Sequence, residues 1–319
     1  MARYVGKRLM WLVVIMISVA ILIFSIMYFV PGDPVKIMLG DSATAEEVQL
    51  YRDKLGLNDP FIVQLGRYLY DTFIRWDFGT SYTMKVPVMS EFITRLPRTL
   101  ALGWLCILVD ALIGIPLGIS AAMHRNSALD HGLMIGSMIG ISIPGFWLAL
   151  LMVMLFAQRL GWLPAYGIDS WKCWIMPVIA GSLAGLATNA RQTRSAVLET
   201  IRADFVTTAR AKGLKESKVI YKHMLPNALI PIISSLGSRF AGAIGGTVVI
   251  ETVFAFPGIG TLMLNGISGR DYPVVRSCVL VLAIFSAFVM LLVDLLYAFI
   301  DPRIKAQYTR MGSKKGGKS

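Results

Sequence analysis

Long apolar runs separated by basic clusters constrain the fold of this sequence more than any other feature. A run of roughly 20 apolar residues is long enough to cross the hydrocarbon core of a bilayer as a helix. Charged residues make up only 16% of the 319 residues, against about 25% in a typical soluble domain. Because the apolar runs consume most of the chain, the sequence predicts an all-α membrane protein and leaves little room for a soluble catalytic domain.

Six apolar runs meet this criterion of length. We predict transmembrane helices at 9–30, 97–122, 132–157, 174–198, 227–254 and 276–300. The first run follows three basic residues, as the apolar core of a signal peptide does. It is too long for such a core and no small-residue cleavage site follows it, so we interpret it as a retained transmembrane helix. In the third run, Pro144 is expected to kink the helix because it removes a backbone hydrogen bond.

The distribution of Lys and Arg predicts the orientation in the membrane, because cytoplasmic loops are enriched in these residues. One side receives both termini and the basic loop 199–226. We therefore predict cytoplasmic termini and a cytoplasmic loop between the fourth and fifth helices. The net charge of +12 then reflects topology rather than a nucleic-acid-binding face, since no recognition motif accompanies it.

This topology divides the chain into four parts. They are the N-terminal end with the first helix (1–30), an external helical insertion (31–96), the core of five further helices (97–300) and a basic cytoplasmic tail (301–319). Residues 312–319 of the tail match the pattern G-x-x-x-x-G-K-S of phosphate-binding loops. That loop requires a strand before it and a helix after it, so we expect a basic tail that binds no ATP.

The external insertion is predicted to contain short helices. Thr44 and Glu47 have the spacing of a capping box, which places a helix start near Ala45. Gly56 is expected to end that helix, and a second helix fits residues 60–75.

Charged residues within the apolar runs are costly in a membrane and need a physical account. Asp110 in the second helix and Arg239 in the fifth lie at similar predicted depth, so we predict an ion pair between them. Glu251 lies near the outer end of the fifth helix. It is either a structural group, paired or facing water at the end of the helix bundle, or part of a solute path, and the sequence leaves these interpretations open.

Small residues cluster in the fifth helix, including Gly242, Gly245 and Gly246. Gly242 and Gly246 are four residues apart, so one face of the helix carries no side chains and lets another backbone approach. This face either packs within the chain or meets a second subunit.

The loop between the fourth and fifth helices is amphipathic. A helix with Phe205 and Ala209 on one face is expected to end at Gly213, and a second helix with Val219 is expected to end before Pro226. Two helices joined at a glycine would form a compact knob. The alternative is an amphipathic segment that lies on anionic lipid.

The loop resembles the EAA loop of ABC importer permeases, in which EAA, three residues, Gly, nine residues and Ile-x-Leu-Pro follow one another. The matching positions are Thr207, Thr208 and Ala209 for EAA, Gly213 for the glycine, His223 in place of Ile, and Leu225 with Pro226 at the end. These departures are similar to the peptide and nickel branch of that family, where TARAKG and H-x-L-x-N are usual. Further segments that resemble this branch are PGDP at 31–34, LGL at 55–57, DFG at 77–79, GWLP at 161–164, FAFPGIG at 254–260, RDYP at 270–273 and DPR at 301–303.

The resemblance implies a permease for dipeptides, oligopeptides, glutathione or nickel in a bacterial or archaeal inner membrane. Its partners would be a second permease, either a copy or a paralogue, two ATPase subunits and an external solute-binding protein. ATP and Mg would bind to the ATPase subunits, so no cofactor and no metal is expected in this chain. Transport would proceed by alternating access as the ATPase subunits close on ATP.

The resemblance also implies roles for individual residues. The residues expected to couple the chain to an ATPase are Asp204, Thr207, Thr208, Ala209, Lys212, Gly213, Leu225 and Pro226. Those expected to line the solute path or the permease interface are Gly242, Gly245, Gly246 and Glu251.

Two other classes of membrane protein fit the sequence less well. A self-sufficient secondary transporter usually carries internal repeats with broken helices at matching positions, and we find no convincing repeat. An intramembrane enzyme would need a nucleophile, an acid pair or a metal-ligand spacing. The three histidines, His124, His131 and His223, lie at or near the predicted cytoplasmic surface without such partners. We therefore expect no catalytic residue.

Overall fold

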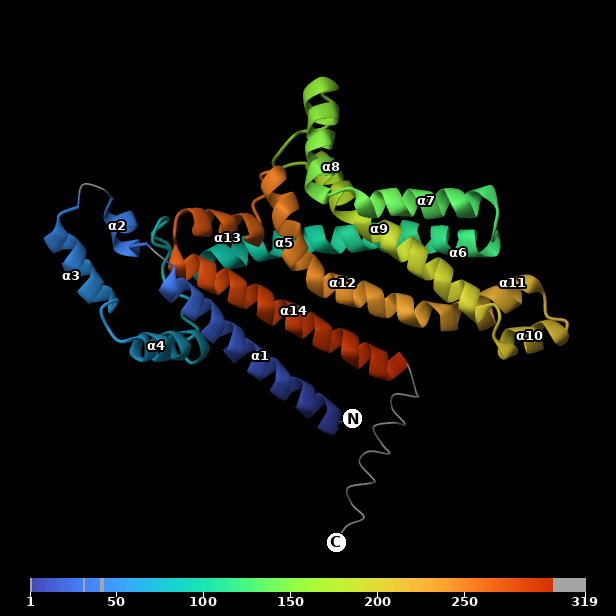
Figure 1. Ribbon diagram of the computed structural model, residues 1–319, viewed down its shortest axis with the longest axis horizontal. Helices are drawn as coiled ribbons and strands as arrows, with labels where there is room; N and C mark the ends of the chain where they lie inside the picture. The colour runs from blue at the N-terminus through green and yellow to red at the C-terminus, as the bar shows by residue number, and fades with distance from the viewer. Residues whose placement is uncertain (1, 31, 41–42, 301–319) are drawn as a thin grey trace, which may run out of the picture. The chain divides into compact units, whose positions relative to one another are not determined.

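The computed structural model describes residues 2–30, 32–40 and 43–300 and is helical through most of them (Figure 1). In these ranges the only β-type pairing is an isolated bridge between Thr80 and Pro87. The all-α fold class predicted from the apolar runs is therefore confirmed for the described chain. The predicted basic tail at 301–319, with its glycine-lysine pattern, lies outside the described residues.

The helices follow one another in the order shown in Figure 1, where η marks a π-helical segment. They are α1 (Ala2–Phe29), α2 (Pro34–Leu39), α3 (Ala45–Leu55), α4 (Phe61–Phe73), α5 (Val88–Val109), η1 (Asp110–Gly114), α6 (Ile115–Met123), α7 (Ala128–Ser142), α8 (Gly145–Met152), η2 (Val153–Arg159), α9 (Lys172–Thr200), α10 (Asp204–Ala211), α11 (Glu216–Lys218), η3 (Val219–Met224), α12 (Leu225–Val253), α13 (Ile259–Ser268) and α14 (Tyr272–Ile300).

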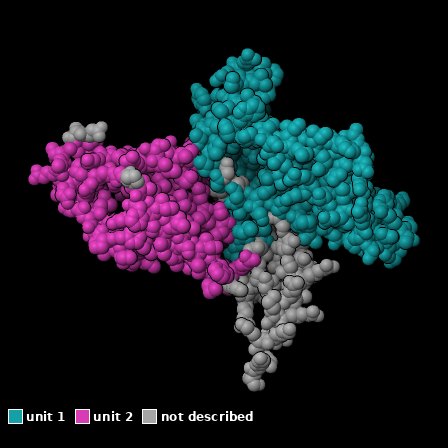
Figure 2. All heavy atoms as spheres, in the orientation of Figure 1, with its two compact units in different colours: residues 1–5, 101–256, 289–319 teal, residues 6–100, 257–288 magenta. Residues whose placement is uncertain are grey.

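The chain forms two compact units (Figure 2). Unit 1 comprises residues 1–5, 101–256 and 289–319, and unit 2 comprises residues 6–100 and 257–288. The predicted division into a first helix, an insertion, a core and a tail follows membrane topology rather than internal contacts, and it stays a prediction.

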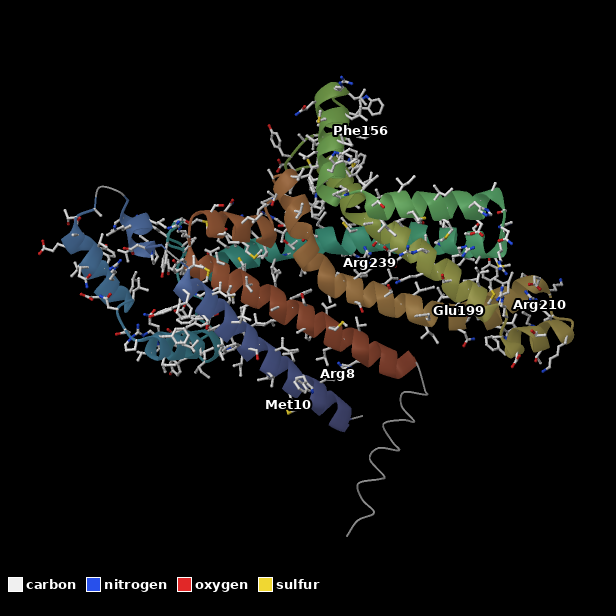
Figure 3. All side chains as sticks on the ribbon, in the orientation of Figure 1. Arg8, Met10, Phe156, Glu199, Arg210 and Arg239 are labelled. Carbon is white, nitrogen blue, oxygen red and sulfur yellow. The ribbon has the colours of Figure 1, made fainter. Side chains whose placement is uncertain are left out.

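Four of the described helical stretches are long and apolar enough to cross a membrane. They are Arg8–Phe29, Val88–Met123, Lys172–Thr200 and Tyr272–Val293. Two bent helix pairs bring the number of candidate spans to six if each pair is one span. The Met10 side chain on α1 is 56% exposed (Figure 3), as expected of a helix that is apolar on every side.

The third predicted span is not one helix with a kink. α7 ends at Ser142 and α8 begins at Gly145, and the two segments meet at an angle of 92°. Ile143 is extended because the ring of Pro144 disfavours helical geometry in the preceding residue. The chain here is therefore a broken span or a re-entrant loop rather than the single kinked helix predicted at 132–157.

The second helix of the loop between the fourth and fifth spans, predicted to end before Pro226, continues through this residue in the structure. α11, η3 and α12 follow one another without a break, and Pro226 stands in the first turn of α12. The π-helical turn η3 shifts the backbone pairing just before the proline, which has no N–H to donate. The same arrangement recurs where η1 precedes Pro116.

Glycines allow close packing in unit 1. A Cβ atom on Gly118 of α6 would lie 2.4 Å from the carbonyl oxygen of Ala190 in α9. A Cβ on Gly114 of η1 would lie 3.0 Å from the carbonyl oxygen of Leu186 in the same helix. Any larger residue would push the η1–α6 segment away from α9, so these glycines set the helix spacing.

In unit 2, the two short helices expected in the insertion are present. Thr44 caps α3 through a capping box: its N–H donates to Glu47 Oε2 at 2.9 Å, and the Glu47 N–H donates to Thr44 Oγ1 at 3.3 Å. Gly56 ends α3 with φ of 65°. α4 confirms the second predicted helix.

A buried carboxylate fixes the loop between α4 and α5. Asp271 precedes α14 and is fully buried. Its Oδ2 accepts hydrogen bonds from Ser81 Oγ at 2.5 Å, from the Thr83 N–H at 3.0 Å and from Thr83 Oγ1 at 2.8 Å. Its Oδ1 accepts from the Val274 N–H at 3.4 Å, as a helix N-cap does. One side chain thus both starts α14 and holds the loop.

Candidate coupling loop and intramembrane ion pair

The segment from α10 to η3 forms a knob with a buried side and an exposed side. Val206 and Ala209 of α10 pack with Val219 and Met224 of η3. The same cluster includes Val197 of α9, so the knob is anchored to the adjoining helix. This packing is that of a folded element, and in Figure 1 the knob projects beyond the ends of α9 and α12.

The sequence placed Phe205 and Ala209 on one helix face, and in the structure only Ala209 of the two is buried. Ala209 is 6% exposed, Val206 is fully buried and Phe205 is 44% exposed. A helix of two turns offers too few positions to fix its rotation from hydrophobicity alone. Val206 is therefore the inward residue, and the Phe205 ring is available to another surface.

Gly213 ends α10 in a left-handed conformation. Its φ is 71°, and its N–H donates to the Arg210 carbonyl oxygen at 2.9 Å. A Cβ atom at this position would meet nothing within 4 Å among the described residues. The need for glycine therefore arises from backbone conformation alone, because most side chains disfavour positive φ.

An ion pair that sequence reasoning missed spans this turn. Arg210 Nη2 lies 2.6 Å from Glu216 Oε1, and Arg210 Nε donates to Glu216 Oε2 at 3.2 Å (Figure 3). Both side chains are exposed, so the pair contributes little to stability. Its two-point geometry holds α10 and α11 in a defined relation across Gly213.

The remaining predicted loop residues divide between the two sides of the knob. The exposed ones are Asp204, Thr207, Thr208, Lys212 and Pro226. Ala209 and Leu225 are buried in the supporting cluster. The loop thus presents a mainly polar surface, which also carries the Phe205 ring, above an apolar base.

Asp110 and Arg239 are brought together in unit 1. Arg239 Nη2 of α12 donates to Asp110 Oδ2 at 2.8 Å. The Asp110 side chain is fully buried, whereas 31% of the Arg239 side chain is exposed. Figure 3 labels Arg239 on α12. Asp110 opens the π-helical segment η1, a distortion that often marks functional positions.

A third residue makes room for this pair. A Cβ atom on Gly185 of α9 would lie 1.8 Å from Arg239 Nη2 and 2.0 Å from Asp110 Oδ2. The pair therefore crosses α9 at Gly185, one of the two glycines of this helix. A cavity of about 310 Å³ adjoins it, with Cys106, Gly242 and Thr247 among its lining residues.

The predicted path residues lie on α12. A Cβ atom on Gly242 or Gly245 would meet nothing within 4 Å among the described residues. Gly246 belongs to the same helix. Glu251 is fully buried, and Thr247 Oγ1 donates to its Oε1 at 3.3 Å. Its burial does not fit a water-facing group at a bundle end.

A second charged contact was not found from the sequence. Arg194 Nη2 of α9 donates to Asp130 Oδ2 of α7 at 2.8 Å, and Arg194 Nε donates to Asp130 Oδ1. Asp130 is nearly buried. No local signal in the sequence separates an arginine that forms an ion pair from one that only marks the cytoplasmic side of a span.

Two family models match the chain and together cover most of it. The binding-protein-dependent transport system inner membrane component matches residues 114–306, and the N-terminal membrane component of such systems matches residues 1–103. The chain belongs to this family. It is a permease subunit of an ABC importer and not itself an enzyme, because ATP is hydrolysed by separate ATPase subunits. The predicted class is confirmed, and the alternative of a self-sufficient secondary transporter is set aside.

Curated relatives resemble the permease over nearly its whole length. The dipeptide transport system permease protein DppB of Alkalihalophilus pseudofirmus is 38% identical, covering 96% of this chain and 100% of that protein. The glutathione transport system permease protein GsiC of Salmonella paratyphi A is 39% identical, covering 96% of this chain and 99% of that protein.

Solved structures share the fold. A chain of the MetNI methionine ABC transporter in an inward facing conformation matches with a TM-score of 0.58 at 20% identity, covering 67% of this chain and 97% of that chain. An amino acid ABC transporter determined with histidines matches with a TM-score of 0.52 at 16% identity, covering 67% of this chain and 94% of that chain. At this identity the likeness concerns the fold alone.

Proposed function

We propose that this permease pairs with a second permease and moves peptides or a related small solute into the cell by alternating access. Two ATPase subunits would hold ATP and Mg and drive the cycle, and an external binding protein would deliver the solute. The names of the relatives support this solute class, since they describe dipeptide and glutathione permeases.

The observation that carries the proposal is the knob between α9 and α12. Its apolar base is anchored on Val197 and Val206, while Thr207, Thr208 and Phe205 face outward. A segment lying on lipid would turn its apolar side chains to the membrane, whereas this knob packs most of them against its own helices. The exposed surface is therefore assigned to an ATPase subunit.

The proposed topology has six spans, cytoplasmic termini and the knob in the cytoplasm of a bacterium. The four continuous apolar helices and the two bent pairs support the number of spans. The excess of Lys and Arg in loop 199–226 supports the orientation.

The open glycine face of α12 is assigned to the second permease or to the solute path. Gly242 and Gly245 meet no other part of the described chain that would exclude a Cβ. By contrast, a Cβ on Gly237 of the same helix would lie 2.5 Å from Val293, so that glycine packs within the subunit. The two kinds of glycine thus face different neighbours.

The decisive experiment changes the shape of the knob without changing its charge. Gly213→Val forces a β-branched residue into positive φ, which costs at least about 1–2 kcal/mol. Gly213→Asn is the matched control, because Asn tolerates the left-handed conformation. We expect Gly213→Val to insert normally but to lose the ATPase in a pull-down from membranes and to lose ATP-dependent uptake. Gly213→Asn should retain both.

Replacing Lys212, Lys215 and Lys218 by Gln tests the lipid alternative. A lipid-lying loop would lose function in this triple variant and tolerate Gly213→Val. If Gly213→Val retains its ATPase and transports normally, the coupling role of the knob is wrong.

A further inference from the structure

Arg276 is a mostly buried cation without an acidic partner. It lies in the second turn of α14, in unit 2. Its guanidinium carbon is 5.0 Å from the centre of the Tyr68 ring and 5.4 Å from that of Phe24. Its Nε donates to the Tyr272 carbonyl oxygen at 3.3 Å. In the part of the chain that the structure describes, no carboxylate oxygen lies within 4.0 Å of its nitrogens.

The acidic residues of the surrounding elements are committed elsewhere. Their partners are Arg52 for Asp33 (2.6 Å), Arg75 for Asp71 (3.6 Å), the Gly79 N–H for Asp77 (2.8 Å), and Ser81 and Thr83 for Asp271. Contacts with aromatic rings stabilise a cation only modestly. Withdrawing a charge from water without a charged partner is costly. The rings alone therefore do not offset the burial of Arg276, and an anion would.

A cavity of about 360 Å³ opens beside this cation. Its charged lining residues are Asp33, Arg52 and Arg276. Because Asp33 and Arg52 neutralise each other, the lining carries one unmatched positive charge. The walls include Tyr82 and Tyr272, and Asn58 adds a polar amide. The volume falls within the range of about 300–1,000 Å³ that is typical of small-molecule sites.

We propose that this cavity is a binding subsite for the carboxylate of a small organic solute, such as the C-terminus of a short peptide. A guanidinium and a carboxylate match in shape and charge, because two parallel N–H groups can donate to two oxygens. The aromatic walls would contact the apolar part of the solute. The choice of a peptide-like solute rests on the proposed function, whereas the demand for an anion rests on Arg276 itself.

The test measures binding of alanyl-alanine to the purified full chain in detergent by calorimetry. Alanyl-alanine amide is the matched probe, because it has the same shape without the negative charge. We expect the dipeptide to bind the wild-type chain at least tenfold more tightly than the amide does, which corresponds to about 1.4 kcal/mol. Arg276→Gln should abolish this preference. Arg75→Gln is the matched control, since Arg75 also lies over a tyrosine ring but is exposed and does not line the cavity.

Three outcomes would overturn the subsite. They are equal affinity for the dipeptide and its amide, an unchanged preference in Arg276→Gln, and binding of inorganic phosphate or phosphatidylglycerol with no binding of the dipeptide. The comparison of acid and amide uses the wild-type chain, so it decides the matter even if Arg276→Gln does not fold. ATP-dependent uptake by the assembled importer in proteoliposomes is a separate measurement. If uptake persists unchanged in Arg276→Gln, the proposed function stands and the proposed subsite is wrong. If the wild type shows no uptake, the proposed function is wrong.

Discussion

From the geometry of the ion pair between Asp110 and Arg239, we predict that loss of Arg239 destabilises the chain more than loss of Asp110. Arg239→Gln leaves a fully buried carboxylate without its partner, whereas Asp110→Asn leaves a guanidinium that keeps 31% of its side chain exposed. Removing one member of a buried pair costs about 3–5 kcal/mol in soluble proteins. We expect Asp110→Asn to fall at the lower end, about 3 kcal/mol, because water still reaches the remaining cation. Arg239→Gln should fall at the upper end.

Thermal unfolding in detergent can measure the difference with a thiol-reactive dye, because Cys106, Cys173 and Cys278 are all buried thiols. A loss of about 3 kcal/mol corresponds to a melting shift of about 6–12 °C on the scale of soluble domains. The double variant with both neutral residues should recover much of the loss, since two neutral side chains leave no unpaired charge. Equal shifts for the two single variants, or no recovery in the double variant, would refute this account of the pair.

Four further substitutions probe other parts of the molecule. Gly185→Ala should lower the melting temperature as much as loss of the ion pair does, because the added Cβ overlaps the charged atoms of Asp110 and Arg239. Gly242→Ala should leave the melting temperature of the isolated chain unchanged, because its Cβ meets open space. Asp271→Asn should cost about 1.5–3 kcal/mol, the range for hydrogen bonds to charged groups, and should increase proteolysis of the loop that contains Ser81. Hydrogen bonds from Thr44 lower the pKa of Glu47. The ionised Glu47 carboxylate therefore stabilises the folded state above the ordinary carboxyl pKa, and this contribution is lost as pH falls through the lowered pKa. In Thr44→Ala, an NMR titration should show the pKa of Glu47 raised only part of the way toward its ordinary value, because the backbone N–H of residue 44 still donates to this carboxylate.

Features encoded by neighbouring residues were predictable from the sequence. The capping box of α3 depends on Thr44 and Glu47, three residues apart, and the structure contains it. The apolar helices follow from hydropathy over about 20 residues. The contact between Asp110 and Arg239 could be proposed because two costly charges at one depth have few other partners.

Apart from the contact between Asp110 and Arg239, features that depend on distant contacts were not predictable. The hydrogen bond from Ser81 to Asp271 joins residues 190 positions apart, and neither residue carries a local signal for the other. The right-angled break at Pro144 depends on how far the chain can turn after Ile143 adopts an extended conformation. A proline alone indicates a perturbed helix and does not give the angle.

The absence of a side chain at Gly185 links three positions in the evolution of this permease. A methyl group there cannot coexist with the bridge between Asp110 and Arg239 as it is built, because both partners already occupy that space. Substitution at one of the three sites therefore changes what is tolerated at the other two. Related permeases should fall into two groups, one with glycine and both charges, and one with a larger residue at position 185 and neutral residues at 110 and 239. Intermediates between the groups should be rare, since a single step leaves either an overlap or an unpaired charge within the helices.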